Sequence, residues 1–172
     1  IGGSNGSVTV TMECLGNEGT VTAANQNAGG IFGCNMSGAA SPIFINCYVT
    51  GPVKGGKESG QLTGYAGNGQ AFNCYCSGSI VGYYYQDMSD AMLRGRPKST
   101  SCYSTTPDKN AEQIKADQVS SGELCYLLNE FSGQDKPVWF QTIGKDDHPV
   151  LDPTHGIVLL ADDGTFFNED TD

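Results

Sequence analysis

The sequence predicts a mainly β fold, namely a parallel β-solenoid of about three coils followed by a small C-terminal α+β capping module. A cysteine-containing pattern recurs at nearly even spacing, 19 of the 24 glycines lie in residues 1–100, and one amphipathic helical segment follows the repeats. Recurrence at about 20–50 residues is typical of stacked repeats, because a single coil cannot bury its apolar face alone. We therefore assign residues 1–106 to the repeats, 107–161 to the capping module and 162–172 to an acidic tail or linker.

The recurring pattern reads Asn46-Cys47-Tyr48, then Asn73-Cys74-Tyr75, then Ser101-Cys102-Tyr103. We align Cys14 with the three later cysteines, because it precedes Cys47 by a similar interval. The segment Phe44–Thr50 is rich in β-branched and aromatic residues and predicts a strand, in which side chains alternate between two faces. We expect the cysteines to form an interior column and the tyrosines an exterior column, with neighbouring strands about 4.8 Å apart.

A second recurrence lies between the cysteine positions, where Ala28–Gly33 matches Ser59–Gly64 one repeat later. Together with the Asn-Cys-Tyr-x-(Thr/Ser)-Gly segments, these stretches resemble the GLUG repeat of bacterial cell-surface and secreted proteins. That family includes adhesin-like chains and non-catalytic regions of immunoglobulin-A-cleaving metallopeptidases. The resemblance covers roughly residues 8–106 and implies adhesion or ligand binding as part of a larger bacterial protein. The third copy departs from the pattern, because a long insert follows Ile80–Gly82.

Residues 107–161 combine one helix with two strand-like runs. Ser120 and Glu123 fit a capping box, and the apolar stripe that follows predicts a helix over about 121–131. The stripe consists of Leu124, Leu127, Leu128 and Phe131. The two strand-like runs are Val138–Ile143 and Gly156–Ala161. We expect this module to cover the apolar end of the coil stack. Ser120–Asp152 also resembles a module that often follows such repeats in surface proteins of gut-type anaerobes.

The whole net charge of −10 belongs to residues 101–172, because the charges of residues 1–100 balance. An acidic chain repels nucleic acid and anionic lipid, so we expect no nucleic-acid partner and no membrane insertion. Arg94–Lys98 has the core of an AT-hook, which in so acidic a chain we interpret as a solvated basic loop. No run approaches the roughly 18 apolar residues of a membrane helix, and Ile1–Gly3 lacks the layout of a signal peptide. We expect a monomeric fragment of a larger surface or secreted protein.

Seven cysteines leave three alternatives open: buried thiols, which we favour, a disulfide between neighbouring coils, or a metal site. Zinc ligands usually show two-residue spacers, which this chain lacks, so we predict no metal and no cofactor. Both histidines and three carboxylates lie in Lys145–His155, which we interpret as a charged turn between two strands. No cysteine sits in a recognisable nucleophile context. We therefore predict no catalytic residues and no enzymatic activity.

The insert after the third copy carries the candidate binding residues. Clustered tyrosines present flat amphipathic platforms that suit sugars or peptides. We predict that a host or microbial glycan or protein binds to this cluster, which consists of Tyr83, Tyr84, Tyr85, Asp87 and Arg94. The alternative is that alternate tyrosines are strand residues half buried under the insert.

Three classes of function compete. The repeats and the lack of catalytic spacing favour a non-enzymatic adhesion or binding module. A structural stalk or spacer of a surface protein would show the same features. A carbohydrate-active β-solenoid enzyme would need acidic and basic side chains clustered on one coil face, and the insert alone offers them, at Asp87, Asp90, Arg94 and Arg96.

Overall fold

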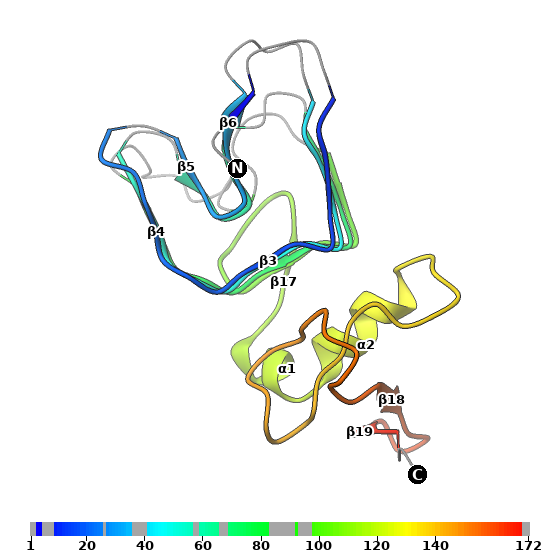
Figure 1. The fold of residues 1–172 in the computed structure, drawn as a ribbon. Helices are drawn as coiled ribbons and strands as arrows, with labels where there is room; N and C mark the ends of the chain where they lie inside the picture. The colour runs from blue at the N-terminus through cyan, green and yellow to red at the C-terminus, as the bar shows by residue number, and fades with distance from the viewer. Residues whose placement is uncertain are drawn as a thin grey trace. The chain divides into compact units, whose positions relative to one another are not determined.

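The computed structural model describes residues 3–4, 9–25, 27–35, 41–56, 59–65, 69–82, 92 and 98–169. The chain divides into two compact units, Ile1–Gln113 (unit 1) and Ile114–Asp172 (unit 2). Unit 1 is built from parallel strands, and unit 2 has two short helices and an antiparallel strand pair (Figure 1). The expected mainly β character is confirmed. No helix within these ranges is long and apolar enough to cross a membrane.

Within the described residues, the strands of unit 1 form five parallel sheets. In order along the chain the first sheet has β2 (Thr11–Glu13), β7 (Ile43–Ile45), β12 (Gln70–Phe72) and β15 (Lys98–Thr100), and the second has β3 (Gly16–Asn17), β8 (Tyr48–Val49), β13 (Tyr75–Cys76), β16 (Tyr103–Ser104) and β17 (Glu112–Gln113). The third has β4 (Val21–Thr22), β9 (Val53–Gly55) and β14 (Ile80–Gly82), the fourth β5 (Ala28–Gly29) and β10 (Ser59–Gly60), and the fifth β1 (Gly3–Ser4), β6 (Phe32–Asn35) and β11 (Thr63–Tyr65).

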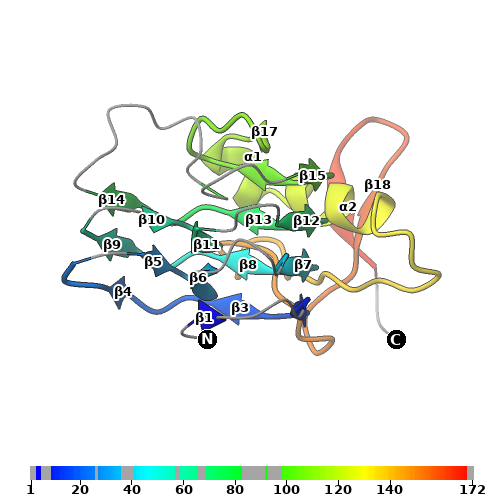
Figure 2. The same cartoon turned by 90° about the horizontal axis from the view of Figure 1, so that it is seen from above.

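The chain passes through these sheets in the same order several times, and we call each pass a coil. Coil 1 is β2–β6, coil 2 is β7–β11, coil 3 is β12–β14 and coil 4 is β15–β16. Pairing is in register, since Thr11 pairs with Ile43, Ile43 with Gln70 and Gln70 with Lys98. Strands of successive coils overlie one another in Figure 1 and lie side by side in Figure 2. Each coil therefore repeats the one before it at a nearly constant interval in the sequence.

The match between Ala28–Gly33 and Ser59–Gly64 is also a structural match. Ala28 pairs with Ser59, and Phe32 pairs with Thr63, so the two segments are neighbours at the spacing expected from the sequence. The sequence recurrence therefore gives the correct register for β5, β6, β10 and β11.

The predicted continuous strand Phe44–Thr50 is wrong, because the chain turns a corner at Asn46. Asn46, Asn73 and Ser101 have φ of 51°, 53° and 50°, each between two strands of its coil. Asparagine tolerates this left-handed conformation better than most residues. Asn73 Nδ2 also donates a hydrogen bond of 2.7 Å to Asn46 Oδ1, which joins the corners of coils 2 and 3.

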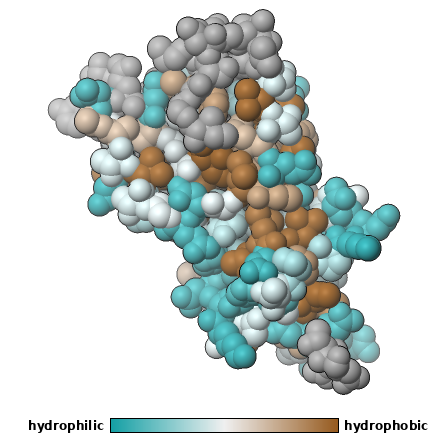
Figure 3. Space-filling model, in the orientation of Figure 1, coloured by the Kyte–Doolittle hydropathy of each residue, from teal (hydrophilic) through white to brown (hydrophobic). Residues whose placement is uncertain are grey.

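Three cysteines follow these corners and lie in the core of unit 1. Cys47, Cys74 and Cys102 are 0%, 0% and 4% exposed, and they pack with larger apolar residues that include Met12, Phe32, Phe44, Leu62 and Met92. In Figure 3, hydrophobic residues gather within the outline of unit 1 on the side shown, with hydrophilic residues around them. The interior column of cysteines is confirmed for these three.

The assignment of Cys14 to the same column is wrong. Thr11 pairs with Ile43 and Gly16 with Tyr48, so Cys14 shares the row of Asn46 and Leu15 shares the row of Cys47. Backbone hydrogen bonds agree, because Tyr48 N donates to Leu15 O as Tyr75 N donates to Cys47 O. Cys14 is accordingly an exposed corner residue with a φ of 52°.

Unit 2 contains α1 (Ala116–Ser120), α2 (Glu123–Glu130), β18 (Val158–Leu160) and β19 (Phe166–Asn168). The expected helix over about 121–131 is confirmed as α2, and α1 precedes it as a short helix that the sequence analysis does not predict. Ser120 ends α1, and α2 begins after Gly122, whose φ of 93° breaks the helix between them. The expected capping box at Ser120 is wrong for this reason. Of the apolar stripe, Leu124 and Leu128 are buried, whereas Phe131 is 56% exposed.

One strand prediction and the predicted acidic tail of residues 162–172 differ from the structure. Val138–Ile143 forms one isolated antiparallel bridge, between Phe140 and Val150. Residues 166–168, which the sequence analysis places in the acidic tail, form β19 and pair antiparallel with β18. Asn168 fixes this strand, because its side chain accepts a hydrogen bond from Ile143 N and donates one to Gln141 O, at 2.8 and 2.6 Å.

Candidate functional site

The predicted binding residues Tyr83, Tyr84, Tyr85, Asp87 and Arg94 lie outside the described residues. The described chain reaches them from β14, whose last residue, Gly82, directly precedes Tyr83 in the sequence. Val81 of this strand is 59% exposed. The structure around Val81 is therefore the described surface nearest in sequence to the predicted cluster.

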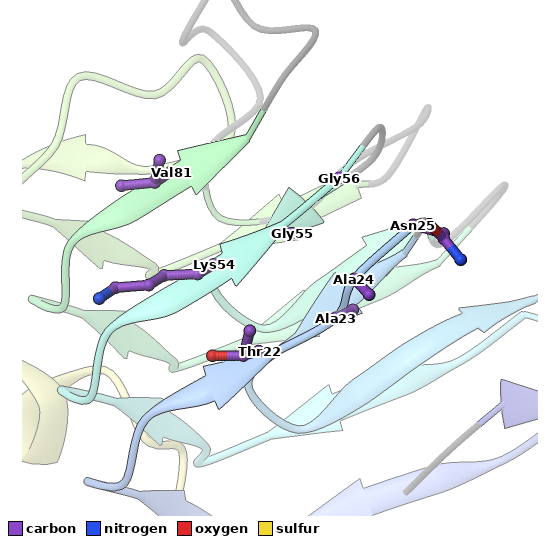
Figure 4. Close-up of a pocket in the computed structure, with 8 residues that line it drawn as sticks. All are labelled: Thr22, Ala23, Ala24, Asn25, Lys54, Gly55, Gly56 and Val81. Atoms are coloured by element: carbon purple, nitrogen blue, oxygen red, sulfur yellow. The ribbon is translucent and has the colours of Figure 1, made fainter.

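A shallow hollow of about 420 Å³ lies on the β4–β9–β14 sheet and includes Val81 (Figure 4). Thr22, Lys54 and Val81 form one row across it, because Thr22 pairs with Lys54 and Lys54 with Val81. The other lining residues are Ala23, Ala24, Asn25, Gly55 and Gly56. The hollow thus spans three consecutive coils.

Small residues leave this surface recessed, and few of its groups are polar. Ala23 and Gly55 share one row and Ala24 and Gly56 the next, so two coils contribute almost no side chain there. Of the eight lining residues, Lys54 alone is charged, and Thr22 and Asn25 add a hydroxyl and an amide. The arrangement can hold a ligand by shape, hydrogen bonds and one positive charge. The two pairs of small residues, one coil apart, were the sequence signal for this site.

The expected exterior tyrosine column exists in register but is buried. Tyr75 pairs with both Tyr48 and Tyr103, and the three side chains are 1%, 7% and 4% exposed. The rings of Tyr48 and Tyr75 stack with centroids 5.4 Å apart and an interplanar angle of 4°. Burial raises the pKa of Tyr48, as does its 2.7 Å hydrogen bond to Glu18. The expectation that this column is exterior is wrong as to exposure, and the stacked rings of Tyr48 and Tyr75 cover each other's faces.

The cysteines of the core are free thiols that are closed to solvent. Cys47 N donates to Cys74 Sγ at 3.3 Å, and the Cys74 thiol itself donates to Phe72 O at 3.2 Å. Burial raises the pKa of Cys74 well above its ordinary value, so it stays protonated. Burial likewise raises the pKa of Cys125 in unit 2 to about 12. Among the described residues no group of three or more His, Cys, Asp or Glu side chains could hold a metal ion.

Unit 2 brings together one pair from the histidine-containing segment. His155 Nδ1 lies 2.6 Å from Asp146 Oδ2, and the Thr142 backbone N–H also donates to that carboxylate. Burial alone would raise the pKa of Asp146, but the hydrogen bonds from His155 and Thr142 outweigh it and hold that pKa below its ordinary value. The bond to Asp146 raises the pKa of His155 although burial acts in the opposite direction.

This pair predicts a pH dependence for unit 2. Stability from the raised pKa of His155 is complete below about pH 6.5 and is lost as pH rises through that pKa, whereas stability from Asp146 is lost as pH falls below about 4. Because His155 is 32% exposed, we expect a loss of about 1 kcal/mol or less between pH 5 and pH 8. Urea unfolding followed by fluorescence of Trp139, the single tryptophan, measures it. The loss of stability should vanish in His155→Asn and persist in His148→Asn. If the free energy of unfolding of His155→Asn still fell between pH 5 and pH 8 as in the unaltered chain, His155 would not be its cause.

Comparison with protein-family models, with curated proteins and with solved structures finds no match to this chain. The geometry of the hollow and of the coils therefore carries the functional argument.

Proposed function

We propose that the chain is a non-enzymatic cell-surface or secreted module of a larger bacterial protein, and that it binds a glycan or protein ligand. In this proposal unit 1 is a parallel β-solenoid of GLUG-type coils. Support comes from the in-register parallel pairing of successive coils, and from the corner and cysteine residues that recur with it. Stacked coils of this kind present extended surfaces for binding.

The observation that carries the binding proposal is the hollow on β4–β9–β14. It is recessed, it combines an apolar floor with a few polar groups, and it spans three coils. Ligand sites commonly have this composition. The candidate tyrosines Tyr83–Tyr85 lie outside the described residues and follow β14 directly in the sequence.

Substitution of Lys54 tests whether the hollow binds the ligand. We expect the intact chain to bind members of a glycan array or to retain a host extracellular protein in a pull-down, and Lys54→Ala to weaken the selected interaction about tenfold. Titration of each variant with the selected ligand by calorimetry measures the change. Lys145→Ala is the matched control, because Lys145 is an exposed lysine of unit 2. Binding that is equally strong in Lys54→Ala would remove the hollow from the proposal.

The two alternatives make different predictions. A structural stalk would bind nothing in either assay, and the stacking of coils along one direction is the observation that favours it. A carbohydrate-active enzyme would turn over uronate polymers, with loss of turnover in Asp87→Ala or Arg94→Ala. Such turnover would contradict the non-enzymatic proposal.

A further inference from the structure

The outer face of the β2–β7–β12–β15 sheet carries two rows of side chains in strict register. One row is Thr11, Ile43, Gln70 and Lys98, and the other is Glu13, Ile45, Phe72 and Thr100. Between them lies the inward row, in which Met12, Phe44 and Ala71 are 2%, 0% and 0% exposed. Because side chains alternate across a strand, the two outer rows face away from the core of unit 1.

This face has an apolar centre and a polar rim. Phe72 is 37% exposed on β12, and its neighbour across the strand pair, Ile45, is half-buried beside Ile43. Gln70 lies two residues before Phe72 on the same strand, and Thr100 pairs with Phe72 on the neighbouring strand, so both side chains lie beside the phenylalanine ring. The rim therefore offers amide and hydroxyl groups within reach of a molecule lying on the ring.

Charge is absent from the centre of the face. Its two charged side chains are Glu13 on β2 and Lys98 on β15, which are the two outer strands of the sheet. They have opposite signs and lie on different rows. The centre thus favours an uncharged ligand, whereas the hollow on β4–β9–β14 carries the positive charge of Lys54.

The size of the face decides between kinds of partner. Between their Cα atoms, four strands about 4.8 Å apart and two rows about 7 Å apart span on the order of 100 Å² in plan, and the exposed side chains on them raise the accessible area several-fold. A stable protein–protein interface needs about 800 Å² on each partner, so a second copy or a globular protein would find too little surface here. One or two sugar rings match this area, because a pyranose has an apolar C–H face to lie on an aromatic ring and hydroxyls at its edge.

We propose that the outer face of β2–β7–β12–β15, centred on Phe72, is a binding site for a neutral oligosaccharide. The C–H face of one sugar ring lies on Phe72 and Ile45, and Gln70 and Thr100 hydrogen-bond its hydroxyls. This site is on a different sheet from the hollow and goes beyond the function proposed above, because it adds a second contact of different chemistry.

Saturation-transfer NMR of the full chain with neutral hexaoses of glucose, mannose and galactose, and with a hexagalacturonate, tests the proposal. We expect at least one neutral hexaose to bind and to lose at least tenfold in affinity in Phe72→Ala. Phe72→Trp should retain binding. Thr100→Arg should abolish it, because a long side chain on the exposed neighbouring strand covers the ring without touching the core.

Matched controls separate this site from others. Phe167→Ala removes an exposed phenylalanine of unit 2, 45% accessible, and should leave binding unchanged. Phe72 is not among the residues that line the hollow, so Phe72→Ala tests this site alone, and failure of the hollow and failure of the Phe72 site are distinguishable. The proposal is overturned if no neutral hexaose binds, if the acidic hexaose alone binds, or if Phe72→Ala and Thr100→Arg both bind as the unaltered chain does.

Discussion

Gly51→Ala is expected to destabilise unit 1 by about 2–3 kcal/mol, whereas Gly19→Ala should change its stability by less than about 0.5 kcal/mol. Gly19, Gly51 and Gly78 occupy the same corner in coils 1, 2 and 3, because Val21, Val53 and Ile80 pair just beyond them. A Cβ on Gly51 would collide with the carbonyl oxygen of Gly19, and a Cβ on Gly78 with that of Gly51. Backbone atoms cannot rotate away as a flexible side chain can, so the coils would have to separate.

The two substitutions differ in the space available for the added Cβ atom, and neither glycine has a positive φ. Gly51 is not among the glycines with positive φ, and a Cβ on Gly19 would meet nothing nearer than Asn17 Oδ1 at 3.4 Å. Gly19 lies in coil 1 and has no preceding corner against it among the described residues. Urea unfolding followed by far-UV circular dichroism, with hydrogen exchange of unit 1 peptides, measures both variants. Equal losses in Gly51→Ala and Gly19→Ala would show that close coil contact is not the cause.

Much of unit 1 follows from the sequence, because stacking turns sequence spacing into register. The match of Ala28–Gly33 with Ser59–Gly64 and the spacing of Cys47, Cys74 and Cys102 each give correct neighbours. The predicted position of Cys14 is wrong because it rests on the match of one cysteine with another. The number of residues in coil 1 instead puts Leu15 opposite Cys47. The true spacing of coils 1 and 2 is also carried by two valines, Val21 and Val53, which pair directly.

Burial of the tyrosines could not be predicted from alternation along one strand. Alternation separates the Cys47 face from the Tyr48 face but does not say what lies against the second face. Ring stacking between Tyr48 and Tyr75 and the bond to Glu18 depend on neighbours in other coils. A flat ring over Gly16, where a Cβ would collide with the Tyr48 ring, is likewise visible only in three dimensions.

The candidate sites show the same limit. A cluster of tyrosines is visible in the sequence as consecutive identical residues. The hollow, in contrast, forms where side chains are small or absent, at Ala23, Ala24, Gly55 and Gly56. Their alignment becomes apparent only once Val21 is paired with Val53. In unit 2, α2 begins after Gly122, which has a φ of 93°. The local sequence also fits a capping box at Ser120 and Glu123, so the sequence alone does not decide where the helix begins.

Gln141→Ala is expected to destabilise unit 2 by about 3 kcal/mol, because one buried amide joins the end of α1 to the backbone at Asp146. Gln141 is 0% exposed, and its Nε2 donates to Val119 O at 3.0 Å and to Ser120 O and Asp146 O at 3.3 Å. Val119 and Ser120 are the last residues of α1, whose final carbonyl groups lack partners within the helix. The glutamine therefore completes the end of α1 from a segment that is distant in the sequence.

Removing the amide would leave those carbonyls without that donor inside the protein and would open a cavity, so both effects act in the same direction. Urea unfolding followed by Trp139 fluorescence measures the loss, because Trp139 is the single tryptophan and is 0% exposed. Gln134→Ala is the matched control, since Gln134 is exposed and should cost less than about 0.5 kcal/mol. Gln141→Met keeps most of the side-chain volume and loses the donor, so its loss of stability should fall between those of Gln141→Ala and Gln134→Ala. A value for Gln141→Met equal to that of the unaltered chain would show that packing and not hydrogen bonding makes this residue important.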